Sequence, residues 1–227
     1  MKRFLKYFSP LEWCLWLSSL FLISLFFFLF DKEGYLTLIS SYIGVTSLIF
    51  AAKGNPIGPA LMIIFSVLYG IISYSFSYYG EMITYLGMTA PMSVFALVAW
   101  LKNPFGESRS EVKVNKITGK ESVFAIMLTL LVTIAFYFIL LAFNTANLIP
   151  STISVTTSFL AVYLTWRRSP YYALAYAAND IILIVLWVLA TLEDISYLSV
   201  TVCFAVFLVN DLYGFISWKK MQKRQEK

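Results

Sequence analysis

Apolar residues fill most of the chain in long runs that short polar breaks separate. Runs of about 18 or more apolar residues are typical of helices that cross a membrane. Asp31-Lys32-Glu33-Gly34 ends the first run, Lys53-Gly54-Asn55-Pro56 ends the second, and Gly80-Glu81 separates the third from the fourth. The pattern predicts eight membrane-spanning helices, at residues 11–30, 35–52, 57–77, 82–101, 121–143, 147–165, 171–191 and 195–218.

Two of these stretches resemble each other at an offset of 118 residues. The clearest matching positions are aromatic: Tyr69 and Trp187, Tyr79 and Tyr197, and Trp100 and Trp218. The matching units cover 35–102 and 147–220, with three helices each, and helix 121–143 lies between them. Three helices leave the chain on the opposite side of the membrane, and the extra helix returns it to the side where the first unit began. The two units are therefore expected to be parallel and related by an axis along the membrane normal, as in SWEET-type carriers.

The predicted fold is therefore an all-α integral membrane protein, with eight transmembrane helices in the order one, three, one, three. Residues 1–34 form an N-terminal helix, and 35–102 form the first three-helix repeat. A cytoplasmic loop and linker helix occupy 103–146, the second repeat occupies 147–220, and 221–227 form a cytoplasmic tail.

The distribution of charge predicts the orientation in the membrane. With the N-terminus in the cytoplasm, all of the 17 Lys and Arg residues except Lys32 fall on the cytoplasmic side, as the positive-inside rule requires. The external turns then carry the acidic residues Asp31, Glu33, Glu81, Glu193 and Asp194. Both termini are expected in the cytoplasm.

The first helix is preceded by Lys2, Arg3 and Lys6, as a signal peptide would be. Its apolar run is longer than a typical signal core, and no small-residue cleavage site precedes Asp31. We interpret it as a retained helix.

Composition excludes several classes of function. The chain is 60% hydrophobic and 13% charged, whereas soluble domains average about 25% charged residues. It has no histidine, and both cysteines, Cys14 and Cys203, lie in apolar runs. These features argue against a His/Cys metal site and a disulfide framework. A nucleotide-binding loop is also absent, so we expect no cofactor, no enzymatic activity and no nucleic-acid partner.

Asp180 lies near the middle of the seventh predicted helix, next to Asn179. A carboxylate there costs about 2.5–3.5 kcal/mol on insertion scales and usually faces a protein-lined cavity. Tyr176 and Trp187 share its helix face, four residues before and seven after it. The arrangement favours a flat heterocycle linked to a sugar, with stacked rings and hydrogen-bonded hydroxyls. The alternative is a structural aspartate bonded to a neighbouring helix.

The eighth helix repeats the polar pair as Asn210-Asp211. Asp211 is expected nearer the cytoplasmic end, at a different depth from Asp180, where it either extends to the interface or pairs with Arg167 or Arg168. Asn210 is deeper and suits a neutral polyol or amide ligand.

The first unit is less polar at the matching positions. Ser66 and Tyr69 share a face of the third helix, and Tyr85 lies on the fourth. At the 118-residue offset, Met62 matches Asp180 and Met92 matches Asn210. Such asymmetry suits two halves that hold different parts of one ligand. Pro91 lies inside the fourth helix and is expected to kink it.

The chain resembles the PnuC family of vitamin transporters. The resemblance covers about the last four-fifths of the chain and depends on these sequence elements: Ala52-Lys53-Gly54, Leu68-Tyr69, Tyr79-Gly80-Glu81-Met82, Pro91, Trp100, Arg167-Arg168, Asp180 and Trp187. It implies uptake of nicotinamide riboside, thiamine, riboflavin or deoxynucleosides by facilitated diffusion across a bacterial inner membrane. It also implies a homotrimer and a cytosolic kinase that traps the substrate by phosphorylation.

The chain departs from the nicotinamide riboside members of that family at several positions. Those members have a glutamine where this chain has Val162 and a tryptophan where it has Tyr176. An asparagine and a glutamine of their fourth helix fall at Tyr85 and Ser93.

Three functional hypotheses follow. The first is a uniporter for nicotinamide riboside or a related base-plus-sugar compound, with a deoxynucleoside or thiamine as the competing substrate. The second makes Asp180 a proton-coupling carboxylate, and the third is a membrane scaffold without a ligand. For the uniporter, the predicted substrate-binding residues are Ser66, Tyr69, Tyr85, Tyr176, Asn179, Asp180, Trp187 and Asn210.

Overall fold

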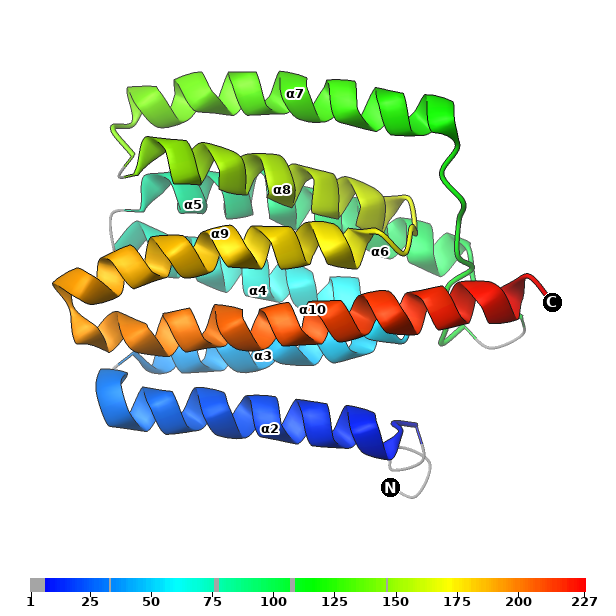
Figure 1. The fold of residues 1–227 in the computed structure, drawn as a ribbon, viewed down its shortest axis with the longest axis horizontal. Coiled ribbons are helices and arrows are strands. Elements are labelled where there is room, and N and C mark those ends of the chain that lie inside the picture. The colour runs from blue at the N-terminus through cyan, green and yellow to red at the C-terminus, as the bar shows by residue number, and fades with distance from the viewer. Residues whose placement is uncertain (1–6, 33, 76–77, 107–108, 146) are drawn as a thin grey trace.

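The computed structural model describes residues 7–32, 34–75, 78–106, 109–145 and 147–227. In these ranges the long helices run side by side along one axis, as Figure 1 shows. Eight helical spans are long and apolar enough to cross a membrane within the described chain. The predicted external residue Glu33 and the predicted cytoplasmic residues Lys2, Arg3 and Lys6 lie outside the described residues.

The first span is α2 (Pro10–Phe26) with the π-helical turn η1 (Phe27–Asp31), followed by α3 (Tyr35–Ala52) and α4 (Ile57–Ser75). The fourth combines α5 (Tyr79–Thr84), the π-helical turn η2 (Tyr85–Thr89) and α6 (Ala90–Lys102). Then come α7 (Gly119–Ala142), α8 (Leu148–Trp166) and α9 (Tyr172–Glu193). The last span is the short 3₁₀ turn η3 (Ile195–Tyr197) with α10 (Leu198–Gln225).

The predicted all-helical fold with eight spans is confirmed, with two corrections. The fourth span begins at Tyr79 rather than 82, so Glu81 lies inside a helix and is only 5% exposed. Its placement in an external turn was wrong, because Gly80 was interpreted as a break although it forms part of the first helical turn. The last helix reaches Gln225 rather than 218, so it includes most of the predicted tail.

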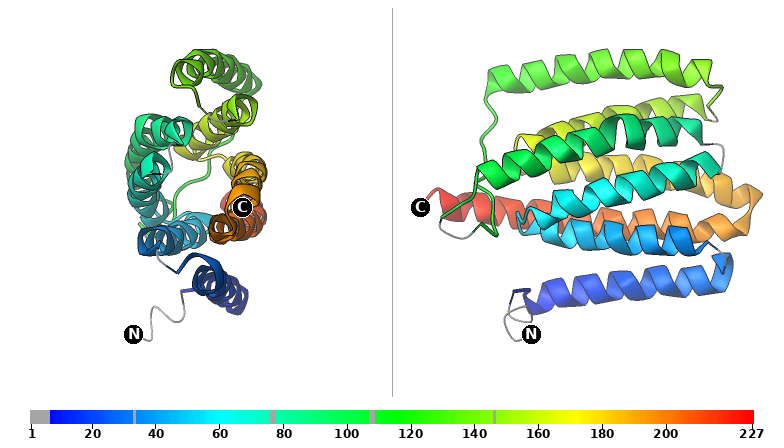
Figure 2. Two further views of the ribbon diagram at one scale, coloured as in Figure 1. Left: turned by 90° about the vertical axis from the view of Figure 1, so that its left-hand side faces the viewer. Right: turned by 180° about the vertical axis from the view of Figure 1, so that it is seen from behind.

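Six helices form a closed ring around the molecular axis. The order is α3, α4, α6, α8, α9 and α10, each packed on the next, and α10 packs against α3 to close the ring. Figure 2 shows this ring end-on, with α2 and α7 outside it. The helix α2 packs on α3 and α10, and α7 packs on α8.

Each predicted three-helix unit supplies one continuous half of the ring. The helices outside it, α2 and α7, lie on opposite sides of the molecule (Figure 1). This is the placement expected for two units related by a two-fold axis along the helices. The duplication itself stays a prediction.

A π-helical turn precedes Pro91. Proline has no backbone N–H, and its ring clashes with the carbonyl four residues earlier, here that of Gly87. The wider turn η2, Tyr85–Thr89, occupies this stretch immediately before α6. Insertions of this kind are frequent at functional sites, and η2 carries the predicted site residue Tyr85.

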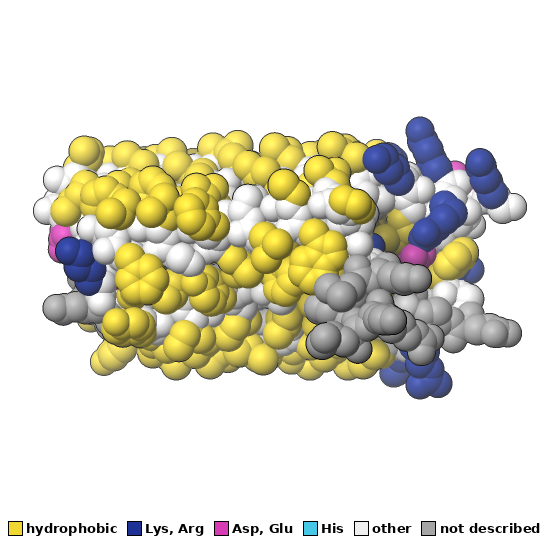
Figure 3. Space-filling view, turned by 90° about the horizontal axis from the view of Figure 1, so that it is seen from below, with side chains coloured by type: hydrophobic (Ala, Val, Ile, Leu, Met, Phe, Trp, Pro, Cys, Tyr) yellow, Lys and Arg dark blue, Asp and Glu magenta, His cyan; other side chains and the backbone are white. Residues whose placement is uncertain are grey.

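The surface matches a protein that spans a membrane. Apolar side chains cover the middle, and basic side chains gather at one end, as Figure 3 shows. We call this the basic end; there α3 is followed by Lys53 and α8 by Arg167. The outward face of α7 is apolar and exposed, with Met127 and Leu131 both more than 60% exposed.

An extended segment, residues 109–118, crosses the basic end. The backbone N–H of Val112 donates to the carbonyl of Gly54 at 2.9 Å, and that of Asn115 donates to the carbonyl of Arg168 at 3.0 Å. The side chain of Val112 is fully buried. The predicted long polar loop therefore connects parts of the bundle that are far apart in sequence.

Candidate functional site

The centre of the ring is filled by aromatic side chains. Tyr69 of α4 lies with its ring centroid 4.4 Å from Tyr85 of η2 and 5.6 Å from Phe204 of α10. Phe207 contacts Phe65 at 5.5 Å. All five rings are buried. They come from both halves of the ring and form an apolar box on its axis.

Gly44 in α3 makes room for this box. A Cβ at this position would lie 2.3 Å from the Cζ of Phe207 and 3.0 Å from the ring of Phe65. Any larger residue would push these aromatic side chains out of the centre. Glycine here therefore serves close approach rather than a turn.

Two carboxyl groups meet beside the box. Asp180 is 3% exposed and Asp211 is 4% exposed, and their side chains hydrogen-bond to each other. Both carboxyl groups line the central cavity of the ring. They are the polar counterpart of the aromatic box there.

This contact corrects the expectation for Asp211. The two aspartates lie at one depth, and neither arginine pairs with Asp211. Arg167 instead forms an ion pair with Glu121 of α7, and this hydrogen bond raises the pKa of the Arg167 guanidinium above its usual value. Arg168 donates to the carbonyl of Lys113 at 3.3 Å. Asp211 was misplaced because α10 extends to Gln225 rather than to 218, so counting from the predicted end gave the wrong depth.

Asn179 is held by three hydroxyl groups of α8. Its Oδ1 accepts from Ser154 at 3.2 Å, from Thr157 at 2.9 Å and from Ser158 at 3.0 Å. These bonds fix the amide plane beside the aspartates. Asn179 also lines the central cavity.

The central cavity is closed in this conformation. Its volume is about 20 Å³, which is space for roughly one water molecule. The lining is shared by the aromatic box, the carboxyl pair, Asn179 and Tyr176. A similar small cavity, also lined by Tyr176, continues towards the basic end past Met92 and Val162.

On the side away from the basic end, the site is closed by Trp187. Its indole N–H donates to the hydroxyl of Tyr69 at 2.8 Å, and its ring packs on Tyr78 and Tyr197 with centroids 5.2 and 5.9 Å apart. Beyond it lies a cavity of about 10 Å³ lined by Glu81 and Thr145. Glu81 is buried and lines this cavity next to Trp187.

Towards the basic end, two tryptophans block the space inside the ring of helices. The rings of Trp100 and Trp218 lie 5.3 Å apart and are fully buried. Trp100 of the first half donates to the carbonyl of Thr165 in the second, and Trp218 donates to the carbonyl of Ala51 in the first, at 2.9 and 2.8 Å. Each half therefore bonds across to the other.

Most of the predicted binding residues come together. Four of them line the central cavity: Tyr85, Tyr176, Asn179 and Asp180. Tyr69 lies beside it and accepts the hydrogen bond of Trp187, which closes the cavity on one side. The other two predicted residues do not line it. The hydroxyl of Ser66 donates back to the carbonyl of Met62 at 2.7 Å, and the amide of Asn210 donates to Ser19 of α2 at 3.0 Å. Asn210 thus faces the helix outside the ring.

Sequence reasoning missed four groups that line the path: Glu81, Asp211, Phe204 and Phe207. The run Tyr79-Gly80-Glu81-Met82 carried part of the family resemblance and could have indicated Glu81. The two phenylalanines gave no signal, because a membrane helix is rich in such residues. Among the residues that the structure describes, no group of three Cys, Asp or Glu side chains is placed to hold a metal ion.

Residues 34–220 match the family described as nicotinamide mononucleotide transporter. The chain belongs to this family. The predicted resemblance is thereby confirmed, and the protein is a multi-pass membrane transporter rather than an enzyme.

Related proteins are similar over most of their length. The "Nicotinamide riboside transporter PnuC" of Neisseria mucosa is 26% identical over 214 residues, covering 92% of this chain and 81% of that protein. The transporter of the same name from Haemophilus influenzae is 22% identical over 224 residues, covering 98% and 96%. The fold matches the solved structure "Crystal structure of the Vitamin B3 transporter PnuC", with a TM-score of 0.84, 23% identity and coverage of 96% and 94%.

Proposed function

We propose that this transporter is a uniporter that carries nicotinamide riboside, or a related base-plus-sugar compound. The observation that carries the proposal is the aromatic box beside the Asp180–Asp211 pair, on the axis of a closed ring of helices. Nicotinamide riboside is a pyridinium cation joined to a ribose. Aromatic faces attract such a cation, and a carboxyl pair complements its charge.

Different residues of the site would bind different parts of the ligand. Tyr69, Tyr85 and Tyr176 are placed to enclose the heterocycle. Asp180, which lines the central cavity, would accept a hydrogen bond from a ribose hydroxyl. Asn179, held by α8, would orient the same part of the ligand. A cationic ring favours this site over a neutral one, so thiamine is a stronger competitor than a deoxynucleoside.

The cavity must expand to admit any such compound. The closed centre, with Trp187 on one side and Trp100 and Trp218 on the other, fits a state between two openings. Movement of one half of the ring against the other would expose the site to each side in turn. No ion gradient is needed for this cycle, and a cytosolic kinase would make uptake one-way by phosphorylating the product.

Calorimetry on the purified protein tests the proposal. We expect nicotinamide riboside to bind the native protein, and Asp180→Ala and Trp187→Ala to abolish binding while the protein stays folded. Asp194→Asn, which removes an exposed carboxylate outside the site, is the matched control and should bind normally. Unchanged affinity for nicotinamide riboside in both site variants would contradict the proposal. Thiamine and thymidine, measured in parallel, rank cationic against neutral ligands.

The contact between Asp180 and Asp211 favours one alternative, namely proton-coupled transport through Asp180. A carboxyl pair that holds a proton can release it to either side. Uptake into protein-containing vesicles distinguishes the two mechanisms. An imposed pH gradient leaves a uniporter unaffected and drives a coupled carrier.

We further propose a location in the bacterial inner membrane, with both termini in the cytoplasm. The clustering of Lys and Arg at the basic end supports this orientation. A homotrimer is proposed from the family resemblance. The exposed apolar face of α7 provides a surface that lipid or another subunit can cover.

A further inference from the structure

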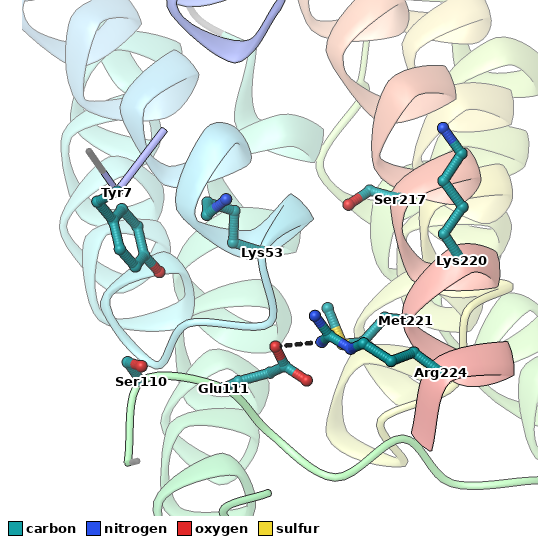
Figure 4. Close-up of a pocket in the computed structure, with 8 residues that line it drawn as sticks. All are labelled: Tyr7, Lys53, Ser110, Glu111, Ser217, Lys220, Met221 and Arg224. Carbon is teal, nitrogen blue, oxygen red and sulfur yellow. Dashed lines mark hydrogen bonds and ion pairs between the residues drawn. The ribbon is translucent and has the colours of Figure 1, made fainter. Parts of the chain in front are cut away.

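A second cavity lies outside the transport path, at the basic end. Its volume is about 250 Å³. Four separate parts of the chain line it, as Figure 4 shows: Tyr7, the turn after α3, the extended segment and the last turns of α10. The lining residues are Tyr7, Lys53, Ser110, Glu111, Ser217, Lys220, Met221 and Arg224.

Among the described residues, the lining carries three positive charges and one negative charge. Lys53 bonds to both carboxylate oxygens of Glu12 at 3.0 and 3.1 Å, and its ammonium lies 5.0 Å from the ring centroid of Tyr7. Arg224 forms an ion pair with Glu111. Within the described residues Lys220 has no ion-pair partner. The cavity is therefore short of negative charge.

The cationic groups come from two parts of the fold. Lys220 and Arg224 are four residues apart on α10 and share one face of that helix. Lys53 is fixed by Glu12 and by the aromatic ring beneath it. Glu111 is anchored by its neighbour Val112, which bonds to Gly54. Lys220 is exposed and the Arg224 side chain is 60% exposed, so an anion would order these two side chains as it binds.

We propose that this cavity binds a phosphate group, presented by a soluble phosphate monoester or by a phospholipid headgroup. Arginine and lysine recognise phosphate through charge-assisted hydrogen bonds, arginine with two parallel donors. The hydroxyl group of Ser217, which also lines the cavity, adds a neutral partner. The volume is below the roughly 300–1,000 Å³ of sites for drug-sized ligands, which suits a phosphate with a small organic group.

A phosphate bound here would act on the closure at the basic end. It would join α10 to the turn after α3, next to the bond between Trp218 and the carbonyl of Ala51. It would also hold the extended segment against both. On the proposed function, a phosphorylated product that accumulates inside would then slow further uptake. This regulatory consequence depends on the proposed function, whereas the binding site does not.

Titration of the full-length protein in detergent tests the site. The probes are inorganic phosphate, adenosine monophosphate, nicotinamide mononucleotide and short-chain phosphatidylglycerol, with thermal stability as the readout. A ligand of the folded state raises the melting temperature by mass action. Lys220→Gln and Arg224→Gln are each expected to weaken binding roughly tenfold, as the loss of a charged hydrogen bond implies. Lys223→Gln is the matched control, since Lys223 is also in the last turns of α10 but does not line the cavity.

Glu111→Gln gives an effect of opposite sign. It removes the only carboxylate that the described residues contribute to the lining and frees Arg224, so phosphate is expected to bind several-fold more tightly. Binding of the soluble monoesters alone identifies a metabolite site, and binding of the phospholipid alone identifies a lipid site. The proposal is overturned if no probe binds, or if Lys223→Gln weakens binding as much as Lys220→Gln.

The variant Trp187→Ala distinguishes binding at the central site from binding at this cavity. It is expected to lose binding of nicotinamide riboside and to retain binding of the phosphate probes. If Lys220→Gln leaves both phosphate binding and riboside binding unchanged, the phosphate site is contradicted and the proposed central site is not.

Discussion

Tyr69 and Trp187 hydrogen-bond to each other at 2.8 Å, although they lie 118 residues apart. They are also the clearest matching positions of the two predicted units. Matching residues of two units can meet each other only near an axis that relates the units. Trp100 and Trp218 meet in the same way at 5.3 Å. Both contacts agree with the two-fold relation predicted for the halves.

Tyr69→Phe is expected to weaken the closure on the side of Trp187. The change leaves a buried indole N–H without its acceptor, which costs about 1–3 kcal/mol. The closed conformation is destabilised by this amount. We therefore expect a lower melting temperature and a faster exchange of substrate across vesicle membranes. Tyr74→Phe, on the same helix but 62% exposed, is the control. Equal exchange rates in both variants would show that the bond does not hold the closure.

Asp180 and Asp211 are expected to act as one unit. Asp180→Asn and Asp211→Asn should each weaken binding of nicotinamide riboside, and the double variant should lose less than the sum of the two. Groups in contact deviate from additivity by about 0.5–3 kcal/mol, whereas distant groups add. Calorimetry of the four proteins gives the coupling. Strict additivity would contradict a shared role.

Gly80→Ala is expected to destabilise the protein and Gly87→Ala is not. A Cβ at position 80 would lie 2.7 Å from the Cγ2 of Thr145, while one at position 87 meets only Ile83, at 4.0 Å. Overpacking costs about 1–3 kcal/mol, whereas alanine in a helix is about 0.5–1 kcal/mol better than glycine. Melting temperatures of the two variants should therefore move in opposite directions.

Cysteine labelling in intact cells checks the orientation. In a background with Cys14→Ser and Cys203→Ala, we expect Lys32→Cys to react with a membrane-impermeant thiol reagent. Lys116→Cys should react only after the cells are permeabilised. The unlabelled background is the control, and the reverse pattern would place the basic end outside.

Hydrophobic pattern alone predicted the number of spans and most of their limits, because in a membrane the length of an apolar run decides whether a helix crosses. The range 35–52 coincides with α3. Glu81 was misjudged since a glycine and an acid resemble a turn in sequence, whereas their burial depends on α7 and α8 packed alongside. Asp211 was misjudged because depth along a helix depends on where that helix leaves the membrane.

Side-chain direction was the other property that the sequence could not settle. Asn210 and Asp211 are neighbours, and one faces α2 while the other faces Asp180. The choice depends on the angle at which α10 packs between α3 and α9. Asp180, Tyr176 and Trp187 could be grouped from the sequence because spacing on one helix determines which residues share a face; Tyr176 and Asp180 line one cavity.

The crossed bonds of Trp100 and Trp218 have a consequence for the way the protein opens. Each indole holds a carbonyl of the opposite half, so separating the halves at the basic end stretches both bonds together. Opening there is then an all-or-none event rather than a gradual widening. Two hydrogen bonds contribute only about 1 kcal/mol each, a barrier that thermal motion crosses often. On the proposed uniport mechanism, such a closure would hold back substrate between openings and would open without an external energy source.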